Sequence, residues 1–529
     1  MTLRIFKIAV IILSLTIIEF GYPQVNQQWV SVYDSSQTNY NSSSFIELHD
    51  SKYLYLLGTN SSDIALIKYN LSGQIIWLQR YNGLGSGNDI PGGIILDKNE
   101  NIYITGNCLG ENTGVDYVTI KYDSSGERIW TDNFTGTGNQ RDASYDIASD
   151  KQGNIFVTGE SYNEISHYRN CLTIKYDSLG NRQWISSYQR GNTWGYEIEI
   201  DGLGNAIVAG KSLGGIFVIK YNTLGDQLWV SSYNGEASPH SLRIDDALNI
   251  YVSGVITGSG GYWDYITIKY NQLGEYLWSR RNNGSANFMD QLNDMAIDVY
   301  GNVYVTGNGT QTGSGYDFTT IKYNTNGDEI WIANYNNGLN DIATSLTLDD
   351  FGNVYVTGNS DGSGSRFDYA TVKYDSTGIQ QWITRYNYSN EYDNEARFIA
   401  VDKYNDVYVT GVTRLNNIAN SLTIKYSQTL TGISQSITET PIEFSLAQNY
   451  PNPFNPKTIV SYKLRVTGYT ELNIFDVLGN EVATLVNETK PAGSYEVEFD
   501  GSKYASGMYF YSLEVDGNHI DTKRMILLK

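Results

Sequence analysis

The chain has 529 residues and a formal net charge of −21, with 36 Lys or Arg and 57 Asp or Glu. This length exceeds one ordinary hydrophobic core, so several domains or an array of repeats are expected. Such an acidic chain is repelled by phosphate backbones, which argues against nucleic-acid binding. The 44 Tyr and 52 Gly, with short runs of Val, Ile and Tyr, indicate an all-β protein.

The N-terminus has the pattern of a signal peptide. Arg4 and Lys7 precede an apolar run, Ile8–Ile18, which is too short to span a bilayer comfortably. We therefore predict a signal peptide over residues 1–24, removed near Gly21–Gln24. No second run of about 20 apolar residues follows, so the sequence predicts no membrane span.

One motif, Tyr-[Asn/Asp]-x-x-Gly-x-x-x-Trp, recurs seven times at a period of about fifty residues. Such a period is typical of stacked copies of one supersecondary unit. The copies begin at Tyr69, Tyr122, Tyr176, Tyr221, Tyr270, Tyr323 and Tyr374 and end at Trp77, Trp130, Trp184, Trp229, Trp278, Trp331 and Trp382.

Each copy contains four short β-signals separated by turn residues. Representative segments are Trp77–Tyr81, Ser345–Asp349, Asn302–Gly307 and Thr267–Tyr270. The recurring Asp-x-x-Gly-Asn suits a tight turn in which the Asp caps backbone N–H groups. Calcium binding is the less favoured alternative, because a 12-residue loop ending in Glu is absent.

The two ends of the repeat array complement each other. Eight strands carry an Ile/Val-Lys-Tyr signal, whereas Trp29 stands alone at the beginning and Tyr426 has no Trp after it. Pairing the strand at Trp29 with the strand at Lys425 removes the unpaired edge. The sequence therefore predicts an all-β fold, an eight-bladed β-propeller over residues 25–428 with four-stranded blades, closed by its N-terminal strand.

Three repeated or paired side chains carry structural expectations. The recurring Trp and Tyr are expected to wedge between blades. Each recurring Lys is expected to pair with a carboxylate of a neighbouring blade. Cys108 and Cys171 either form a disulfide, as an oxidising compartment allows, or remain small unpaired core residues.

The repeated unit, Val-Tyr-Val-Thr-Gly followed by Ile-Lys-Tyr-[Asn/Asp]-x-x-Gly-x-x-x-Trp, resembles the bacterial SBBP-type β-propeller repeat. The resemblance covers about three-quarters of the chain. Those repeats are usually described as seven-bladed, whereas this chain contains eight.

A polar linker, residues 429–441, precedes a different segment, residues 442–529. Its alternating strands and its Gly, Pro and Asn turns predict a small Ig-like β-sandwich. The opening Asn449-Tyr-Pro-Asn-Pro-Phe-Asn-Pro456, the Ala-Ser-Gly507-Met-Tyr segment and the basic, apolar end at Lys529 resemble the type A C-terminal sorting domain of the type IX secretion system. The resemblance implies that residues 442–529 engage the secretion machinery and that the protein passes through the periplasm to be secreted or attached to the outer surface. The matching signal residues are Asn449, Pro451, Asn452, Pro453, Phe454, Asn455, Pro456, Gly507 and Lys529.

The sequence contains no motif that assigns catalysis, a cofactor or a metal. The four His residues lack zinc spacing. The two Gly-x-Ser-x-Gly segments, at Gly210–Gly214 and Gly358–Gly362, lack the helix that a nucleophile elbow requires. Acidic residues that we place in loops between blades are Asp290, Asp294, Glu391, Asp393 and Glu395.

Long loops rich in Gly, Asn, Ser and Tyr are expected on one face of the propeller. They are Asn82–Pro91, Thr135–Ser144, Gly258–Trp263, Asn308–Tyr316, Asn336–Asp341 and Tyr386–Glu395. Loops on a rigid scaffold are common binding sites, and Tyr with small polar residues is a suitable recognition mixture. The candidate binding residues are Trp263, Tyr386, Glu391, Asp393 and Glu395, although Trp263 also fits a buried wedge.

These observations support three hypotheses. The first is an exported scaffold that binds an extracellular protein or a polysaccharide and has no catalytic role. The second is an extracellular carbohydrate-active hydrolase or lyase that uses carboxylates on the long-loop face. The third is a periplasmic assembly scaffold, which the sorting segment disfavours.

Overall fold

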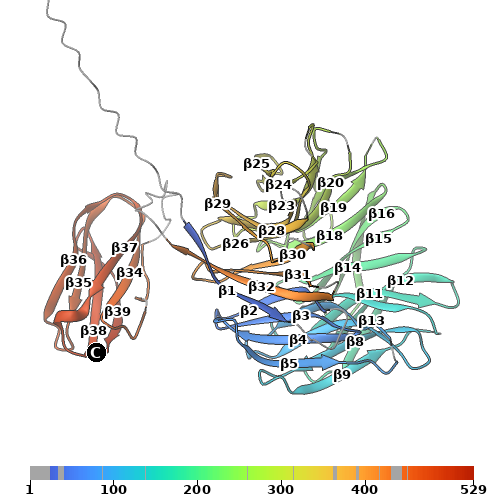
Figure 1. Ribbon diagram of the computed structural model, residues 1–529, viewed down its shortest axis with the longest axis horizontal. Helices are drawn as coiled ribbons and strands as arrows, with labels where there is room; N and C mark the ends of the chain where they lie inside the picture. Colours follow the sequence, from blue (N-terminus) through green and yellow to red (C-terminus); the bar gives the residue numbers. More distant parts are fainter. Residues whose placement is uncertain are drawn as a thin grey trace, which may run out of the picture. The chain divides into compact units, whose positions relative to one another are not determined.

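The computed structural model describes residues 24–33, 41–429 and 444–528, apart from residues 86, 138, 259, 287, 314, 362–365, 389–391, 416–417 and 450. Nearly all of the predicted signal peptide and linker, together with Glu391 and Lys529, lies outside the described residues. The chain divides into two compact units, Met1–Thr431 and Gly432–Lys529 (Figure 1). The described residues form β-strands, connections and one short 3-10 helix. The expected all-β class is therefore confirmed.

The described part of the first unit contains eight four-stranded antiparallel sheets, which we number along the ring. In each sheet the first strand named is the inner strand and the last is the outer strand. Sheet 1 contains β2 (Asn41–His49), β3 (Tyr53–Asn60), β4 (Asp63–Asn70) and β5 (Ile75–Tyr81). Sheet 2 contains β6 (Ile90–Leu96), β7 (Ile102–Leu109), β8 (Val115–Tyr122) and β9 (Arg128–Phe134). Sheet 3 contains β10 (Asp142–Ser149), β11 (Ile155–Asn163), β12 (Tyr168–Tyr176) and β13 (Arg182–Tyr188). Sheet 4 contains β14 (Thr193–Ile200), β15 (Ala206–Ser212), β16 (Gly215–Tyr221) and β17 (Gln227–Asn234).

Sheets 5 to 8 continue the same order. Sheet 5 contains β18 (Ala237–Ile244), β19 (Ile250–Thr257), β20 (Trp263–Tyr270) and β21 (Tyr276–Asn282). Sheet 6 contains β22 (Gln291–Ile297), β23 (Val303–Thr310), β24 (Tyr316–Tyr323) and β25 (Glu329–Tyr335). Sheet 7 contains β26 (Asp341–Leu348), β27 (Val354–Asp361), β28 (Phe367–Tyr374) and β29 (Gln380–Tyr386). Sheet 8 contains β30 (Asn394–Val401), β31 (Val407–Leu415), β32 (Ile418–Thr429) and, as its outer strand, β1 (Gln24–Tyr33).

Sheet 8 joins the two ends of the repeat array. β1 pairs antiparallel with β32, and Trp29 lies opposite Lys425. This is the pairing that the sequence predicts. It gives the last sheet its fourth strand, so that β32 lies inside sheet 8 and β1 is the outer edge strand.

The turns on one edge of the sheets are capped by the recurring Asp. Asp298 Oδ1 accepts the backbone N–H groups of Tyr300 and Asn302 at 3.0 and 2.9 Å, and Oδ2 accepts Asn302 Nδ2 at 2.7 Å. Gly301 follows the Asp with φ of +77°, a left-handed conformation that glycine adopts without strain. The same caps occur at Asp97, Asp150, Asp201, Asp349 and Asp402. Their oxygens are used by the turns, as a structural role predicts.

Each Trp of the repeated motif docks on the next sheet. Trp278 Nε1 donates to the carbonyl oxygen of Thr325 at 3.0 Å, and a Cβ built on Gly327 would lie 2.7 Å from the Trp278 ring. Corresponding donations come from Trp77, Trp130, Trp184, Trp229 and Trp331. Trp29 of sheet 8 docks in the same way on sheet 1, at the Leu71 carbonyl and Gly73. The expected wedge role of the repeated Trp is therefore confirmed, and the side chain of Trp29 links the last sheet to the first.

The expected partner of the recurring Lys was largely wrong. Lys269 Nζ donates to the Thr325 carbonyl oxygen at 3.0 Å and lies 4.8 Å from the centre of the Tyr251 ring. Backbone carbonyls of the next sheet also accept from Lys68, Lys121, Lys175 and Lys322. Lys68 pairs in addition with Glu100 of the next sheet, whereas Lys220 and Lys425 pair with Asp201 and Asp406 of their own sheets. Where the acceptor is a backbone carbonyl oxygen, it lies in a turn of the next sheet beside the Lys Nζ and accepts its hydrogen bond in place of the expected carboxylate.

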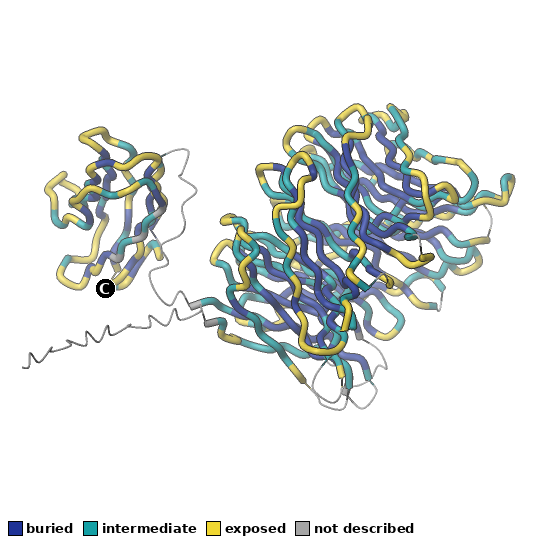
Figure 2. The backbone as a smooth tube through the Cα atoms, turned by 90° about the horizontal axis from the view of Figure 1, so that it is seen from above, coloured by how far each residue is buried: buried dark blue, intermediate teal, exposed yellow. Residues whose placement is uncertain are grey.

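The two cysteines do not pair. Cys108 and Cys171 are free and buried in the apolar interior of the sheets. The disulfide alternative was wrong, and both residues pack as small apolar side chains. Figure 2 shows that buried residues follow the strands, while the turns and loops are exposed.

The second unit consists of two antiparallel sheets around one apolar core. One sheet contains β33 (Ser445–Leu446), β34 (Lys457–Leu464) and β37 (Gly493–Asp500). The other contains β36 (Glu481–Lys490), β35 (Gly468–Phe475), β38 (Gly507–Val515) and β39 (Asn518–Leu527), and the 3-10 helix spans Gly501–Lys503. Alternation of buried and exposed residues along β34 and β35 gives each sheet one apolar face.

The Asn-Tyr-Pro-Asn-Pro-Phe-Asn-Pro segment is bound to the last strand. The backbone of buried Phe454 pairs with Ile526 and Leu528, with N–H to O distances of 2.9 Å. Asn452 Oδ1 accepts the Ile526 N–H at 2.9 Å. The Asn449–Pro456 segment near the start of this unit is therefore hydrogen-bonded to the end of the unit. In the described residues of the chain, no helix has the length and apolarity needed to cross a membrane.

Candidate functional site

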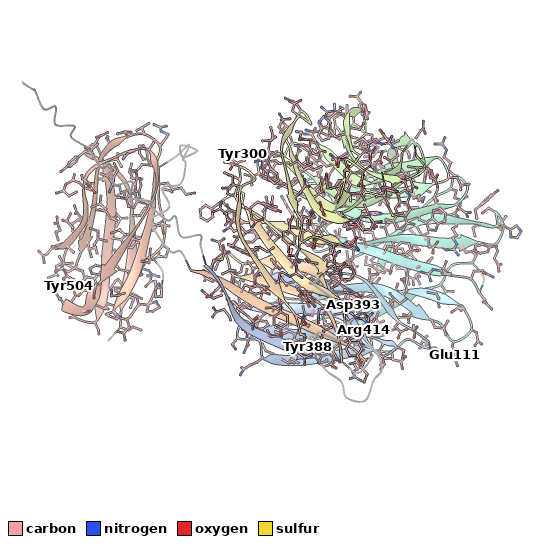
Figure 3. All side chains as sticks on the ribbon, turned by 45° about the horizontal axis from the view of Figure 1, so that its top comes forward. Glu111, Tyr300, Tyr388, Asp393, Arg414 and Tyr504 are labelled. Atoms are coloured by element: carbon pink, nitrogen blue, oxygen red, sulfur yellow. The ribbon has the colours of Figure 1, made fainter. Side chains whose placement is uncertain are left out.

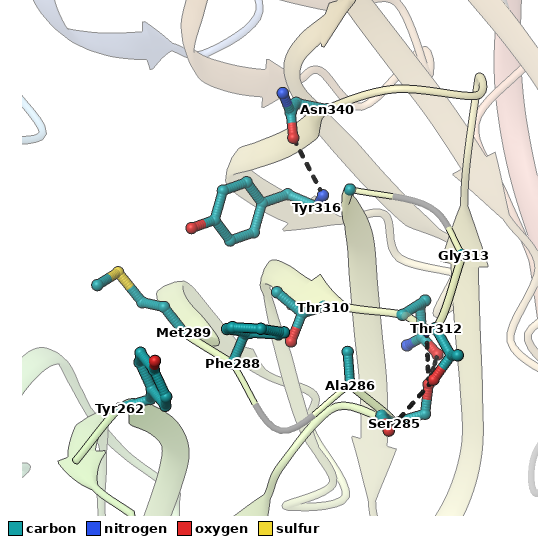
Figure 4. A pocket seen from close by; sticks show the side chains of 12 residues that line it. Tyr262, Ser285, Ala286, Phe288, Met289, Thr310, Thr312, Gly313, Tyr316 and Asn340 are labelled. Atoms are coloured by element: carbon teal, nitrogen blue, oxygen red, sulfur yellow. Dashed lines mark hydrogen bonds between the residues drawn. The ribbon is translucent and has the colours of Figure 1, made fainter. Parts of the chain in front are cut away.

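Four connections of sheets 5, 6 and 7 surround a cavity of about 580 Å³. Their described residues are 258, 260–262, 283–286, 288–290, 311–313, 315 and 336–340, which lie between strands at the edge opposite the Asp-capped turns. The cavity is lined by three aromatic rings, one Met and small uncharged residues (Figure 4). The lining residues are Tyr262, Ser285, Ala286, Phe288, Met289, Thr310, Gln311, Thr312, Gly313, Gly315, Tyr316 and Asn340. We call this the loop pocket.

A buried aspartate fixes the longest of these connections. Asp290 is 0% exposed, and its Oδ2 accepts the Gly284 N–H at 2.6 Å. Its Oδ1 accepts the N–H and the hydroxyl of Thr310 at 2.6 and 2.9 Å. Burial raises the pKa of the Asp290 carboxyl, while these hydrogen bonds oppose the rise. The carboxylate is consumed by loop anchoring, so it is not available to a ligand.

The same anchor recurs between other sheets. Asp89, Asp142 and Asp341 accept backbone N–H groups of Gly83, Gly136 and Asn337 at 2.7 Å. Sequence reasoning missed this role. The signal was an Asp one residue before, or at, the start of an inner strand in several copies.

A second set of hydrogen bonds fixes the polar wall of the loop pocket. Ser285 Oγ donates to Gln311 Oε1 at 2.9 Å and accepts the Thr312 N–H at 3.1 Å. Asn340 Oδ1 accepts the Tyr316 N–H at 3.3 Å. Figure 4 shows these contacts as dashed lines, one between Asn340 and the backbone of Tyr316 and the others beside Ser285 and Thr312. The wall presents hydroxyl and amide groups on connections that are tied together.

The aromatic wall is open to solvent. Phe288 is 54% exposed and Tyr262 is 42% exposed, although their ring centres are 5.4 Å apart at an interplanar angle of 57°. Met289 beside them is also exposed. Large apolar side chains grouped at the surface commonly mark a binding site. Phe288, Met289 and Tyr262 were not among the predicted site residues; the available signal was the Phe-Met pair inside an otherwise polar connection.

The predicted candidate residues do not meet at this pocket. Trp263 is the first residue of β20, next to Tyr262, and it is 40% exposed, so it is not a buried wedge. Tyr386 ends β29 and lies opposite Tyr369. Three of the predicted loops, 258–263, 308–316 and 336–341, contribute to the pocket, while the predicted loop 386–395 does not.

The remaining candidate carboxylates are engaged by cations or backbone. Asp393 Oδ1 accepts the Phe367 N–H at 3.2 Å, and Oδ2 is 3.8 Å from Arg366 Nη1. Glu395 pairs with Arg414 at 3.1 Å and with Arg397 at 3.4 Å. Figure 3 labels Asp393 and Arg414 among the side chains of the first unit. Glu391 lies outside the described residues.

Two of the candidate carboxylates lie in strands, although the sequence analysis placed them in loops. Asp294 lies within β22 and Glu395 within β30, which are inner strands. The inner strand starts immediately after the anchoring residue, at Gln291 in sheet 6, and this early start places Asp294 inside the sheet. Asp294 Oδ2 accepts the Ser345 hydroxyl at 2.9 Å and the Leu346 N–H at 3.0 Å, so it joins sheets 6 and 7.

Inner strands also carry a group of charged side chains, which we call the axial cluster. Its members are Glu47, Asp146, Glu197, Glu199, Arg243 and Asp294. Arg243 Nη1 lies 3.6 Å from Glu199 Oε1. Burial raises the pKa of Glu47 to about 7, which Arg243 opposes, and burial also raises the pKa of Asp146, Glu197, Glu199 and Asp294. We therefore expect the stability of the first unit to vary with pH near neutrality.

No group of three or more His, Cys, Asp or Glu side chains is placed to hold a metal ion in the described part of the chain.

Comparison with known families locates two regions. A family model described as a secretion system C-terminal sorting domain matches residues 448–528. A family model described as a beta-propeller repeat matches residues 330–364. No curated protein matches the chain.

Several solved structures are similar at low identity. A protein of unknown function from Bacteroides caccae has 14% identity and a TM-score of 0.33, covering 54% of this chain and 94% of its own. A catalytically inactive virginiamycin B lyase from Staphylococcus aureus, bound to quinupristin, has 9% identity and a TM-score of 0.38. The match covers 76% of this chain and 99% of the lyase. The WD40 domain of SCAP from fission yeast has 8% identity and a TM-score of 0.42. The match covers 76% of this chain and 98% of the WD40 domain. These likenesses carry no argument about what the chain binds.

The family matches agree with the architecture of both units. The propeller repeat falls on β25, β26 and β27, and the sorting domain covers nearly all of the second unit. The chain therefore carries an SBBP-type beta-propeller repeat and a type IX C-terminal sorting domain, and it is a protein that is secreted or attached to the outer surface.

Proposed function

We propose that this chain is an exported binding protein whose loop pocket holds an extracellular protein or polysaccharide, with no catalytic role. In this proposal residues 25–428 form an eight-bladed propeller closed by the N-terminal strand, and residues 442–529 form an Ig-like unit that engages the secretion machinery. Residues 1–24 act as the signal peptide and residues 429–441 as a linker.

The loop pocket is the observation that carries the proposal. It is concave, is lined by three aromatic rings among small and polar residues, and is built from connections that hydrogen bonds to the buried Asp290 hold in place. Ligand sites commonly have this size and this combination of apolar walls with a few polar groups. The eight docked sheets support the proposal because a rigid scaffold holds the connections at fixed positions.

Loop carboxylates give no support to the hydrolase or lyase alternative. The Asp290 oxygens are used by Gly284 and Thr310, and Glu395 is paired with two arginines. A pair of acids in glycoside hydrolysis has to face the substrate from two sides. Product formation by the full chain on a panel of polysaccharides, abolished by Asp393→Asn or Glu395→Gln, would revive this alternative.

The test is capture of extracellular ligands by the full-length chain. A glycan array and a surface-protein extract are screened with the wild-type chain, with Phe288→Ala and with Phe351→Ala. Phe351 is a matched control because it is also exposed but lies in the Asp-capped turn between β26 and β27. We expect a ligand that Phe288→Ala loses and Phe351→Ala retains. A ligand retained by both variants would place binding elsewhere and reject the loop pocket.

A further inference from the structure

The loop pocket combines open aromatic faces with uncharged hydrogen-bonding groups, and we propose that it binds a neutral oligosaccharide. This inference rests on the proposed function and narrows it to one class of ligand. It follows from three observations: the ring faces, the absence of charge among the lining residues, and the way in which the pocket is built.

The rings provide surfaces that match the apolar side of a sugar. Phe288 and Tyr262 are both exposed and inclined to each other at 57°, and Tyr316 lies across the cavity from them (Figure 4). The face of an aromatic ring carries partial negative charge and attracts the weakly positive C–H groups of a pyranose ring. Two inclined, exposed rings therefore offer apolar surface on one wall, and the ring of Tyr316 also lines the cavity.

The polar groups of the pocket suit hydroxyls and do not suit ions. The lining side chains Ser285, Gln311, Thr312 and Asn340 are uncharged, and all of them have groups that both donate and accept hydrogen bonds. A sugar hydroxyl also donates and accepts. A cationic ligand would require a carboxylate among the lining residues, but Asp290 is fully buried and already engaged, and Asp361 lies behind Asn340, from which it accepts hydrogen bonds. A polyanion would be repelled by a chain of net charge −21.

The construction of the pocket disfavours an extended peptide. Its walls are connections between strands, so it does not present the open strand edge to which an extended peptide adds by β-pairing. The connections are held together by Asp290 and by the contacts between Ser285 and Thr312. An oligosaccharide therefore meets a preformed surface, which lowers the entropy lost on binding. The volume of about 580 Å³ accommodates a short oligosaccharide.

The test measures binding of defined neutral hexasaccharides to the full-length chain by calorimetry. The probes are cellohexaose, xylohexaose, laminarihexaose and hexa-N-acetylchitohexaose, and polygalacturonate serves as the acidic comparison. We expect at least one neutral probe to bind with an affinity that is unchanged between low and high salt, because no ion pair is formed. Phe288→Ala is expected to weaken it about tenfold or more, whereas Phe351→Ala leaves it unchanged.

Thermal melting of both variants verifies that each is folded, and Gln311→Ala provides a second probe of the pocket on its polar wall. The proposal is overturned if only polygalacturonate binds, or if a neutral probe binds equally to wild type, Phe288→Ala and Gln311→Ala. If no saccharide binds but an extracellular protein is captured in a Phe288-dependent manner, the saccharide proposal fails and the proposed binding function stands. If neither class binds through the pocket, both fail.

Discussion

The Asp-capped turn edge and the loop face of the first unit are built from the same repeat, yet they differ in how uniform they are. At the turn edge the same groups meet between successive sheets: an indole N–H, a glycine without a side chain and a carbonyl oxygen. At the loop face the connections differ, and those of sheets 5, 6 and 7 enclose the loop pocket. Groups that must fit a neighbour of fixed shape have little freedom to change, whereas connections that only span two strands are free to carry recognition chemistry.

The largest effect is expected from removing one of the repeated Trp wedges. Trp278→Ala deletes a ring that is 8% exposed and lies between sheets 5 and 6, so we expect a loss of about 3–5 kcal/mol in the free energy of unfolding. Denaturant unfolding of the full chain measures it. Ile330→Ala, on the outer strand β25 and more than half exposed, is the control and is expected to change stability little. Equal losses from both variants would contradict the wedge role.

A smaller loss is expected when a loop anchor is removed. Asp290→Ala leaves the buried N–H group of Thr310 and the part-buried N–H group of Gly284 without their acceptor, at a cost of about 1–3 kcal/mol. Hydrogen exchange is expected to accelerate in residues 283–290, and ligand binding at the loop pocket to weaken. Asp246→Ala at an exposed turn position is the control. Unchanged exchange in the connection would show that Asp290 does not fix it.

Ala substitutions at two glycines distinguish the cost of backbone strain from the cost of a clash with the Trp ring. Gly327 and Gly352 have φ of +81° and +75°, so Ala at either position bears a similar strain of about 1 kcal/mol. A Cβ at Gly327 would also clash with Trp278, whereas at Gly352 the nearest atom is Ser376 Cβ at 3.6 Å. We expect Gly327→Ala to lower the melting temperature more than Gly352→Ala. The difference should disappear in a Trp278→Ala background, and its persistence there would show that the indole is not responsible.

The axial cluster predicts a modest pH effect on the ring. Burial raises the pKa of Glu47 from 4.5 to about 7, so the folded state favours the protonated carboxyl. The stability from this group is fully present below about pH 4.5 and is lost as the pH rises through about 7. The contribution of Glu47 to the free energy of unfolding has an upper bound of about 3 kcal/mol. Solvent reaches the partly accessible side chain and lowers this contribution to about 1 kcal/mol. Glu47→Gln is therefore expected to melt higher than wild type at about pH 8 and not at about pH 5.

For this pH prediction, Glu127→Gln at an exposed turn position is the control, and it should follow wild type at both pH values. A Glu47→Gln variant whose melting temperature runs parallel to wild type across the range would exclude a role for this carboxyl.

The smallest stability effect is expected at the loop pocket itself. Phe288→Ala removes an exposed ring, so the free energy of unfolding should change by no more than about 0.5 kcal/mol. Phe351→Ala, exposed at the turn edge, should be equally neutral. If Phe288→Ala instead destabilises the chain as Trp278→Ala does, the ring is part of the packing and the contrast between the two faces is lost.

Much of the fold followed from the spacing of residues along the chain. The fixed spacing of Tyr, Gly and Trp predicts a turn between the two outer strands of each sheet, with a Gly in the left-handed conformation. The lone Trp29 predicts the pairing of β1 with β32. The sorting segment was recognisable because Asn449 to Pro456 and the end of the chain match one pattern in order. Such features depend on local chemistry repeated at fixed intervals, which a sequence displays directly.

Contacts between sheets were decided by the tertiary structure alone. The Ile-Lys-Tyr motif around Lys269 does not reveal whether the Lys partner is a carboxylate or a carbonyl. The position of the next turn decides this, and it places the Thr325 carbonyl oxygen beside Lys269. The polar neighbours of Asp294 predict a loop, but the inner strand begins before it. The loop pocket likewise joins Tyr262, Phe288 and Asn340 from three connections with Tyr316 at the start of β24, and no spacing rule relates them. The sequence by itself determined the repeating unit and the exported destination, whereas the packing of one sheet on the next decided which side chains meet.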